Sequence, residues 1–180
     1  MTWMRDKNLN LNKRDKMYTL EQCLEQQKKV DASIEHEGTY LPWLAGIGEV
    51  IEMCEHLALI STWKKQPEPD MKQAFMELVD VFAFAMSKLN EYGSVDFELG
   101  NKPERTLKVE LRWIIKEMFF GLITEGSVRE FYAIRNISNL FFGRGIEDVY
   151  YYYMGKQTLT RFRQANGYKD GSYIKMWGGR

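Results

Sequence analysis

The sequence contains few of the residues that stabilise small secreted proteins or interrupt helices. It has two cysteines, Cys23 and Cys54, in 180 residues, which is too few for the disulfide framework of a secreted domain. Each is better interpreted as a small buried hydrophobic residue in a reducing compartment. Only four prolines are present, and proline is the residue that most disrupts a helix interior. Because prolines are few, the chain can form long helices. Because the cysteines form no disulfide framework of the secreted type, we expect the protein to be cytoplasmic.

The sequence also lacks a net charge and a long apolar run, and each absence argues against a class of protein. The formal net charge is zero, because 25 basic side chains balance 25 acidic ones, whereas nucleic-acid binders usually carry a basic excess. No uninterrupted apolar run approaches the roughly 20 residues that span a bilayer. Residues 1–16 are polar and lack the apolar stretch of a signal peptide. We therefore expect a soluble protein that binds neither nucleic acid nor a membrane.

The spacing of the apolar residues predicts an all-α fold, because they recur three and four positions apart more often than two. We expect residues 1–16 to be a flexible arm and 17–180 to form one domain. Asp70 is a suitable N-cap for a helix that Gly93 would end. Residues 94–144 are predicted to be an inserted helical segment that could be mobile. The predicted helices cover residues 17–37, 43–63, 70–92, 105–124, 127–142 and a segment from about 145.

Two of these predicted helices each contain an apolar run in which the only charges are a pair of acids. The pairs are Glu49 with Glu52, and Glu77 with Asp80. A spacing of three residues places both acids of a pair on one face of the helix, one turn apart. A helix that is apolar nearly all round is normally buried, and a buried carboxylate is costly unless something pairs with it. The pattern indicates that the four acids face a common partner.

A divalent cation would relieve the repulsion among four such acids. Mg²⁺ prefers oxygen ligands, retains waters and takes further ligands from substrate phosphates, so we predict a Mg²⁺–phosphate site between these two helices. The alternative is that the acids lie on solvated faces or pair with lysines across a helix interface. A di-iron centre is disfavoured, because neither His36 nor His56 has a glutamate three residues before it. His56, one turn after Glu52, either supports the site or satisfies a local hydrogen bond.

The order and spacing of the four acids resemble a motif of a known protein family. The motif Glu49-x-x-Glu52, followed after 24 residues by Glu77-x-x-Asp80, resembles the metal motif of the all-α NTP pyrophosphatase superfamily. Within that superfamily, the chain is similar to the dimeric dUTPases and the related phage dCTPase/dUTPase enzymes. The resemblance implies a helical bundle of the all-α NTP pyrophosphatase type.

Three further segments strengthen the resemblance. Residues 27–31 (QKKVD) resemble the family's glutamine-containing first motif, and residues 63–65 (WKK) stand where the family often has a Trp and Lys cluster. Residues 156–171 (KQTLTRFRQANGYKDG) resemble the family's Lys-Asn…Arg-Gln…Gly-Tyr-Lys segment. The likeness covers most of residues 20–92 and 145–177, and residues 94–144 match only in helical character.

The resemblance implies a mechanism and a set of site residues. Mg²⁺ would be bound by the four acids, and Glu49 would also deprotonate or orient the water that attacks a phosphorus. The products would be a nucleoside monophosphate and pyrophosphate, and the enzyme would be a homodimer. The implied substrate-binding residues are Gln27, Trp63, Lys64, Phe84, Lys156, Thr160, Arg163, Asn166, Tyr168 and Lys169.

The sequence departs from the family pattern at positions that concern the substrate. The family commonly has His at the position of Ala83, and Asn where Gln157 and Thr160 stand. By analogy these positions lie nearer the base and sugar than the metal, so they affect the expected base selectivity more than the expected catalysis. Phe84 is a candidate for stacking on the base, and is equally well interpreted as a core residue.

The sequence leaves more than one class of function open. The leading hypothesis is an enzyme, a deoxynucleoside triphosphate pyrophosphatase with dUTP as the first candidate substrate and dCTP as the second. A broader MazG-type nucleotide pyrophosphatase is a close variant. A second class is a protein that senses a nucleotide with the same acids and does not hydrolyse it. A third is a helical interaction protein in which the acids form salt bridges between helices.

Overall fold

The computed structural model describes residues 18–33, 41–60, 68–93, 99 and 111–165. These residues form six α-helices and no strand, which confirms the all-α prediction. The predicted arm, residues 1–16, lies outside the described residues. The helices are α1 (Leu20–Asp31), α2 (Pro42–His56), α3 (Met71–Tyr92), α4 (Leu111–Ile123), α5 (Arg129–Leu140) and α6 (Ile146–Ala165).

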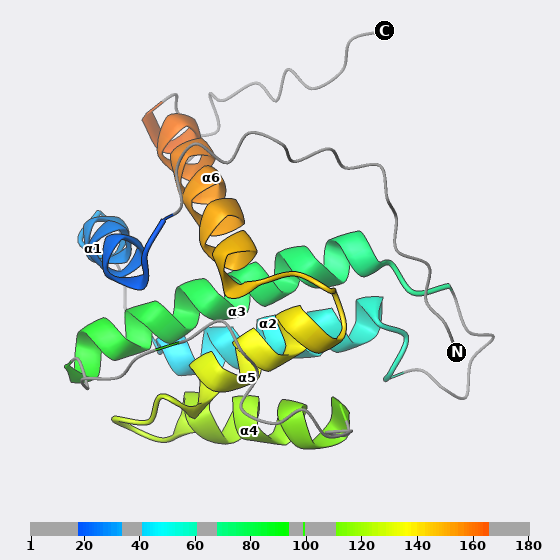
Figure 1. The fold of residues 1–180 in the computed structure, drawn as a ribbon. Coiled ribbons are helices and arrows are strands. Elements are labelled where there is room, and N and C mark those ends of the chain that lie inside the picture. Colours follow the sequence, from blue (N-terminus) through cyan, green and yellow to red (C-terminus); the bar gives the residue numbers. More distant parts are fainter. Residues whose placement is uncertain (1–17, 34–40, 61–67, 94–98, 100–110, 166–180) are drawn as a thin grey trace, which may run out of the picture.

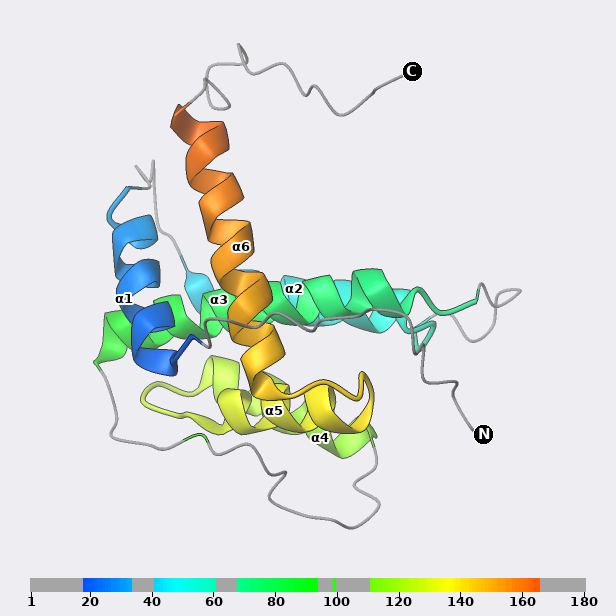
Figure 2. The ribbon, with the colours of Figure 1, turned by 45° about the horizontal axis from the view of Figure 1, so that its top comes forward.

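The long helix α3 is the centre of the arrangement. It runs beside α2, and α4 and α5 pack side by side against this pair (Figure 1). On the other side of the pair, α6 crosses α3 and also contacts α1 (Figure 2). No helix among the described residues is long and apolar enough to cross a membrane. Because α3 contacts α1, α2, α5 and α6, its sequence decides much of the core.

Aromatic side chains from three helices meet in the core around Phe82 of α3. Phe82 is fully buried and meets the ring of Phe131 edge-on at a centroid distance of 5.9 Å. The ring of Tyr153 on α6 approaches the same side chain edge-on at 5.6 Å. Edge-to-face pairs stabilise by about 0.5–1.5 kcal/mol beyond the area that they bury. These contacts attach α5 and α6 to the same turn of α3.

The ends of α3 follow the local signals in the sequence. The carboxylate of Asp70 accepts a hydrogen bond from the backbone N–H of Gln73 at 2.9 Å, so the predicted N-cap is confirmed. Gly93 follows the last helical residue with a φ of 91°, a conformation that glycine adopts at little cost. The bounds predicted for this helix, residues 70–92, agree with the structure to within one residue.

The first helix is shorter than predicted at both ends. Instead of covering residues 17–37, α1 begins after Thr19 and ends at Asp31, and a turn follows at 32–33. The hydroxyl of Thr19 accepts a bond from the backbone of Gln22, whose side chain in turn accepts from the backbone N–H of Thr19. This capping box satisfies two N–H groups that the helix leaves unpaired, and it sets the start of α1.

The prediction that the second helix reaches Trp63 is wrong, because α2 ends at His56. Ala58 has a φ of 57°, and its N–H donates to the carbonyl of Glu55 at 2.9 Å. The N–H of Leu59 donates to the carbonyl of Cys54, also at 2.9 Å. This pair of bonds is the Schellman motif that ends many helices, usually with glycine in the left-handed position. Here alanine occupies it, so the sequence contains no glycine to mark the end.

The helices α4 and α5 share the core with α2 and α3. Met118 and Ile134 are fully buried, and both helices lie against the central pair. The structure places α4 at residues 111–123 and α5 at 129–140, against predicted ranges of 105–124 and 127–142. Residues 100–110 lie outside the described residues. That residues 94–144 form a mobile insertion stays a prediction.

Candidate active site

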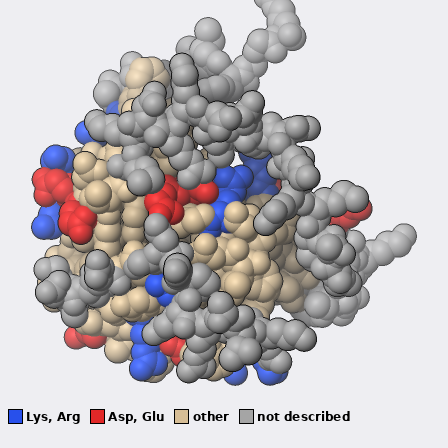
Figure 3. Space-filling model, in the orientation of Figure 1, with Lys and Arg blue, Asp and Glu red and all other residues tan. Residues whose placement is uncertain are grey.

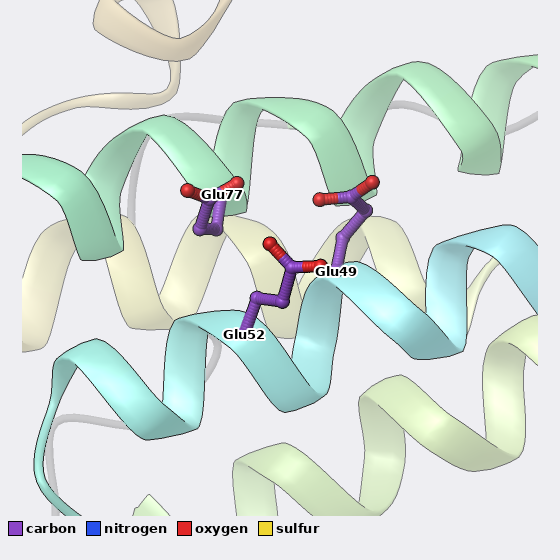
Figure 4. A group of neighbouring side chains, drawn as sticks. All are labelled: Glu49, Glu52 and Glu77. Atoms are coloured by element: carbon purple, nitrogen blue, oxygen red, sulfur yellow. The ribbon is translucent and has the colours of Figure 1, made fainter.

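Three of the four predicted acids meet between α2 and α3. Glu49 and Glu52 extend from α2 toward α3, where Glu77 lies opposite them (Figure 4). Each glutamate offers one carboxylate oxygen, and these three oxygens lie within 4.8 Å of one another. Glu77 is buried, Glu49 is half-buried and Glu52 is exposed. The site is therefore open to solvent on the α2 side, where an ion could enter.

The fourth acid, Asp80, is paired with a lysine from a distant part of the chain. Lys156 of α6 donates from Nζ to Oδ2 of Asp80. Asp80 is 19% exposed and Lys156 is 35% exposed, so the pair is partly shielded from water. Because Asp80 is one turn after Glu77, this contact brings α6 to the edge of the acid group. Among the predicted substrate-binding residues that the structure describes, Lys156 is the one bonded to a predicted metal ligand.

Burial and the neighbouring acids together change how Glu49 titrates. Burial, followed by the charges of Asp80, Glu52 and Glu77, raises its pKa to about 7 against the opposing effect of Lys156. The pKa of Asp80 is also raised, chiefly by burial, although Lys156 lowers it. Repulsion between carboxylates favours their protonated forms. The described site therefore carries more negative charge than its one lysine balances, and a divalent cation would relieve it.

Two residues beside Glu77 were not predicted to bind it. Gln73, one turn earlier on α3, donates from its side-chain nitrogen to Oε1 of Glu77. Nε2 of His56 lies 3.7 Å from the same oxygen. The sequence offered one signal for the first contact, because Gln73 and Glu77 are four residues apart and such side chains are neighbours on a helix. His56 was considered a neighbour of Glu52, and the structure places it against Glu77.

Gln27, a predicted substrate-binding residue, lies in a buried hydrogen-bond network. Its side-chain nitrogen donates to Asp31 at 2.7 Å and to Ser87 at 2.9 Å. Its side-chain oxygen accepts from the hydroxyl of Tyr153 at 2.8 Å. Gln27 is 4% exposed. In this structure its amide connects α1, α3 and α6, and a role in substrate binding stays a prediction.

Phe84, the predicted base-stacking residue, faces α2. A Cβ added to Gly46 would lie 3.2 Å from Cβ of Phe84 and 3.0 Å from a methyl carbon of Leu122. The small residue thus allows α2, α3 and α4 to approach closely. Phe84 is half-buried, so part of its side chain remains exposed. Its role as a stacking residue stays a prediction.

A groove runs along α6 next to the acid group. Its volume is about 530 Å³, within the range of roughly 300–1,000 Å³ that is typical of small-molecule sites. Among the predicted residues, Lys156, Thr160 and Arg163 line it. Nε of Arg163 is buried without a hydrogen-bond partner among the described residues. The other lining residues are Tyr18, Met76, Tyr151, Tyr152, Met154, Gly155, Thr158 and Leu159.

The remaining predicted site residues cannot be placed. They lie outside the described residues, and they are Trp63, Lys64, Asn166, Tyr168 and Lys169.

On the face of the molecule shown in Figure 3, acidic and basic atoms alternate, and among the described residues neither sign forms a large patch. This mixed surface agrees with the zero net charge of the sequence.

The fold and the site together define the class of the protein. It is an all-α protein in which a cluster of carboxylates between two paired helices suits a divalent cation. The family profile described as dUTPase matches residues 19–168. The chain therefore belongs to the dUTPase family, and the family's dimeric, all-α branch is the one that its fold fits. The matched span contains all four acids and Lys156. No curated protein matches the chain.

Proposed function

We propose that the chain is a Mg²⁺-dependent pyrophosphohydrolase of dUTP. One observation carries the proposal: three glutamates of a dUTPase-family chain bring their oxygens within 4.8 Å of one another. These ligands are all oxygen atoms, which suits Mg²⁺, and the excess negative charge favours binding of a cation. The ion, when bound, would supply positive charge to the phosphates and lower the pKa of water beside it.

Glu49 is the proposed acceptor of the water's proton. Its carboxylate lies among the acids that would hold the ion, so a water beside the ion would be within its reach. A carboxylate within hydrogen-bond reach of the attacking water can take its proton. The water oxygen then bonds to a phosphorus of the triphosphate, and a bond from that phosphorus to a bridging oxygen breaks. Nucleoside monophosphate and pyrophosphate are the products.

The phosphates are proposed to lie in the groove along α6. Lys156, Thr160 and Arg163 are spaced four and three residues apart, so they share one side of the helix, and all three line the groove. The two cations neutralise phosphate charge, and the guanidinium can donate two parallel hydrogen bonds to one phosphate. Nε of Arg163 has no partner among the described residues, so it has a donor to offer.

Pyrophosphate release tests the proposal directly. The assay uses dUTP, dCTP, dTTP, dATP and dGTP, each with Mg²⁺ and with EDTA. Selective release from dUTP that EDTA abolishes is the expected result. Preference for dCTP, or equal release from all five, would replace dUTP with dCTP or with a broad MazG-type specificity. Without release, thermal stabilisation by a nucleotide would indicate a sensor, and no stabilisation would indicate an interaction protein.

We further propose that the chain forms a homodimer through α2 and α4. These adjacent helices expose large apolar side chains: Leu44 and Ile51 on α2, and Trp113, Phe120 and Ile123 on α4 are 43–56% exposed. Exposed apolar residues grouped in this way are typical of protein interfaces.

Ile51→Lys should convert the dimer to a monomer in sedimentation analysis. The matched control Leu140→Lys, at an equally exposed position on α5, should remain dimeric, and a monomeric wild-type protein would refute the proposal.

A further inference from the structure

The carboxylate of Glu77 is held from two directions. Gln73 donates to its Oε1 along α3, and the imidazole of His56 reaches the same oxygen from the end of α2, with Nε2 at 3.7 Å. The side chain of Glu77 is 8% exposed, whereas that of His56 is 36% exposed. Among the described residues, the most deeply buried of the four acids is thus also the one with two polar neighbours that are not acids.

The junction of α2 and α3 fixes both neighbours. The backbone N–H of Asp70 donates to the carbonyl of His56 at 2.9 Å. The side chain of Asp70 accepts from the backbone N–H of Gln73 at 2.9 Å. Asp70 therefore contacts the backbone of both residues that reach Glu77. The end of one helix and the start of the next are tied together directly beside the acid group.

We propose that Gln73 and His56 are positioning residues that orient Glu77 toward a divalent cation. A free glutamate samples many rotamers, and it loses that freedom when it binds an ion. A carboxylate oxygen that already accepts a hydrogen bond from Gln73 and lies against the imidazole of His56 is oriented before the ion arrives, and the carboxylate retains a second oxygen and further lone pairs as ligands. The group of oxygens that could bind one ion contains three glutamates and not His56. The histidine therefore acts on Glu77.

The inference rests on the proposed metal site, but it does not require hydrolysis. Partners that orient metal ligands typically contribute 10–100-fold to metal affinity. If the same two residues served only to connect α2 and α3, replacing them would lower the stability of the protein and leave its affinity for the ion unchanged. Metal affinity and stability must therefore be measured separately.

The experiment measures Mn²⁺ binding to the full chain without nucleotide, by the loss of the free-ion signal in electron paramagnetic resonance. Mn²⁺ suits carboxylate ligands as Mg²⁺ does. Gln73→Met removes the donor and keeps the length of the side chain, and it should weaken binding by about 10–100-fold. Lys72→Met is the matched control, because it places the same residue at the adjacent, exposed position of the same helical turn, and it should bind like wild type.

Two more variants separate positioning from folding. His56→Leu should also weaken binding, whereas His56→Gln retains a donor and should bind more tightly than His56→Leu. In the Gln73→Met enzyme, the Mg²⁺ concentration for half-maximal rate should rise by the same factor as the Mn²⁺ dissociation constant. If wild type binds Mn²⁺ and both Gln73→Met and His56→Leu bind equally well, the positioning role is refuted. If wild type does not bind Mn²⁺, the proposed metal site itself is refuted, and this inference with it.

Discussion

Two groups of charged side chains lie on α3, and they are neutralised very differently. Lys88 is 2% exposed, and Glu130 of α5 is fully buried. Nζ of Lys88 donates to Glu130 at 2.8 Å and to the carbonyls of Gly121 and Ser127 at 2.5 and 3.2 Å. An ammonium group has three N–H donors, and all three find acceptors. The charge of the lysine is thus matched within the fold, although Oε2 of Glu130 has no hydrogen-bond partner among the described residues.

The second group lies around Asp80, eight residues before Lys88 on α3, and its negative charges are not balanced by positive ones. Asp80 and Glu77 of α3 join two glutamates of α2. Among the described residues, Lys156 is the one lysine or arginine bonded to these acids, and the imidazole of His56 lies 3.7 Å from Glu77. The charges of Lys88 and Glu130 cancel within the fold, whereas a group of like charges stores repulsion that a ligand can relieve. The contrast indicates that Lys88 and Glu130 serve the fold, and that the acids serve binding and catalysis.

The largest expected effect is on turnover. Glu49→Gln should reduce the rate of pyrophosphate release by at least about 100-fold, because a general base typically contributes 10²–10⁴-fold. Its circular dichroism should stay helical, and Asp80→Asn should behave in the same way. Glu55→Gln, a change to an exposed acid on α2, is the control and should be nearly as active as wild type. A Glu49→Gln enzyme with a near-normal rate would contradict the site assignment.

The next effect concerns the balanced group. Lys88→Met should destabilise the protein by about 3–5 kcal/mol, because it leaves Glu130 buried and without its cation. The free energy of unfolding in urea measures the change. Lys29→Met removes a lysine whose ion pair with Glu25 is about 60% exposed, and it should change stability by less than about 1 kcal/mol. An equal loss in both variants would remove the distinction between the two groups.

The pH dependence of stability distinguishes the unbalanced group further. Folding raises the pKa of Glu49 from its ordinary value of 4.5 to about 7, so between these values the folded protein binds more protons than the unfolded one. The contribution of Glu49 to stability should therefore fall as pH rises from about 4.5 to about 7. Urea midpoints measured in EDTA should show this decline, and Glu49→Gln should reduce it. An identical decline in the variant would show that other groups cause it.

The smallest effect lies at the end of α2, just after His56. Ala58 adopts a left-handed conformation with a φ of 57°, which costs a non-glycine residue roughly 1–2 kcal/mol. Ala58→Gly should therefore stabilise the protein by about 1 kcal/mol, partly offset by the greater freedom of glycine in the unfolded chain. Thermal unfolding measures the difference. A destabilised variant would mean that the methyl group of Ala58 contributes packing that exceeds this strain.

Local signals in the sequence predicted much of the fold. The start and end of α3 follow from Asp70 and Gly93, because capping and left-handed conformations depend on residues within one turn. The end of α2 could not be predicted in this way, since alanine stands where glycine usually marks the end. The capping box of Thr19 and Gln22 has a local signature and was missed, so the start of α1 was placed too early.

The acid pairs were predictable for a related reason. Their spacing of three residues makes Glu49 and Glu52, and likewise Glu77 and Asp80, neighbours on a helix whatever the rest of the chain does. The partner of Glu77 that lies on the same helix, Gln73, was within reach of the same argument. The approach of His56 was not, because the turn between α2 and α3 decides where the end of α2 lies relative to Glu77.

By itself, the sequence determined the helices, the acids on their faces and the family to which the chain belongs. Only the tertiary structure decided that three glutamates from α2 and α3 lie within 4.8 Å of one another and that Lys156 reaches Asp80, 76 residues away. It also decided that Lys88 meets Glu130 across 42 residues. The physical reason is that helix periodicity is set by neighbouring residues, whereas the neutralisation of a buried charge depends on the helices that pack around it.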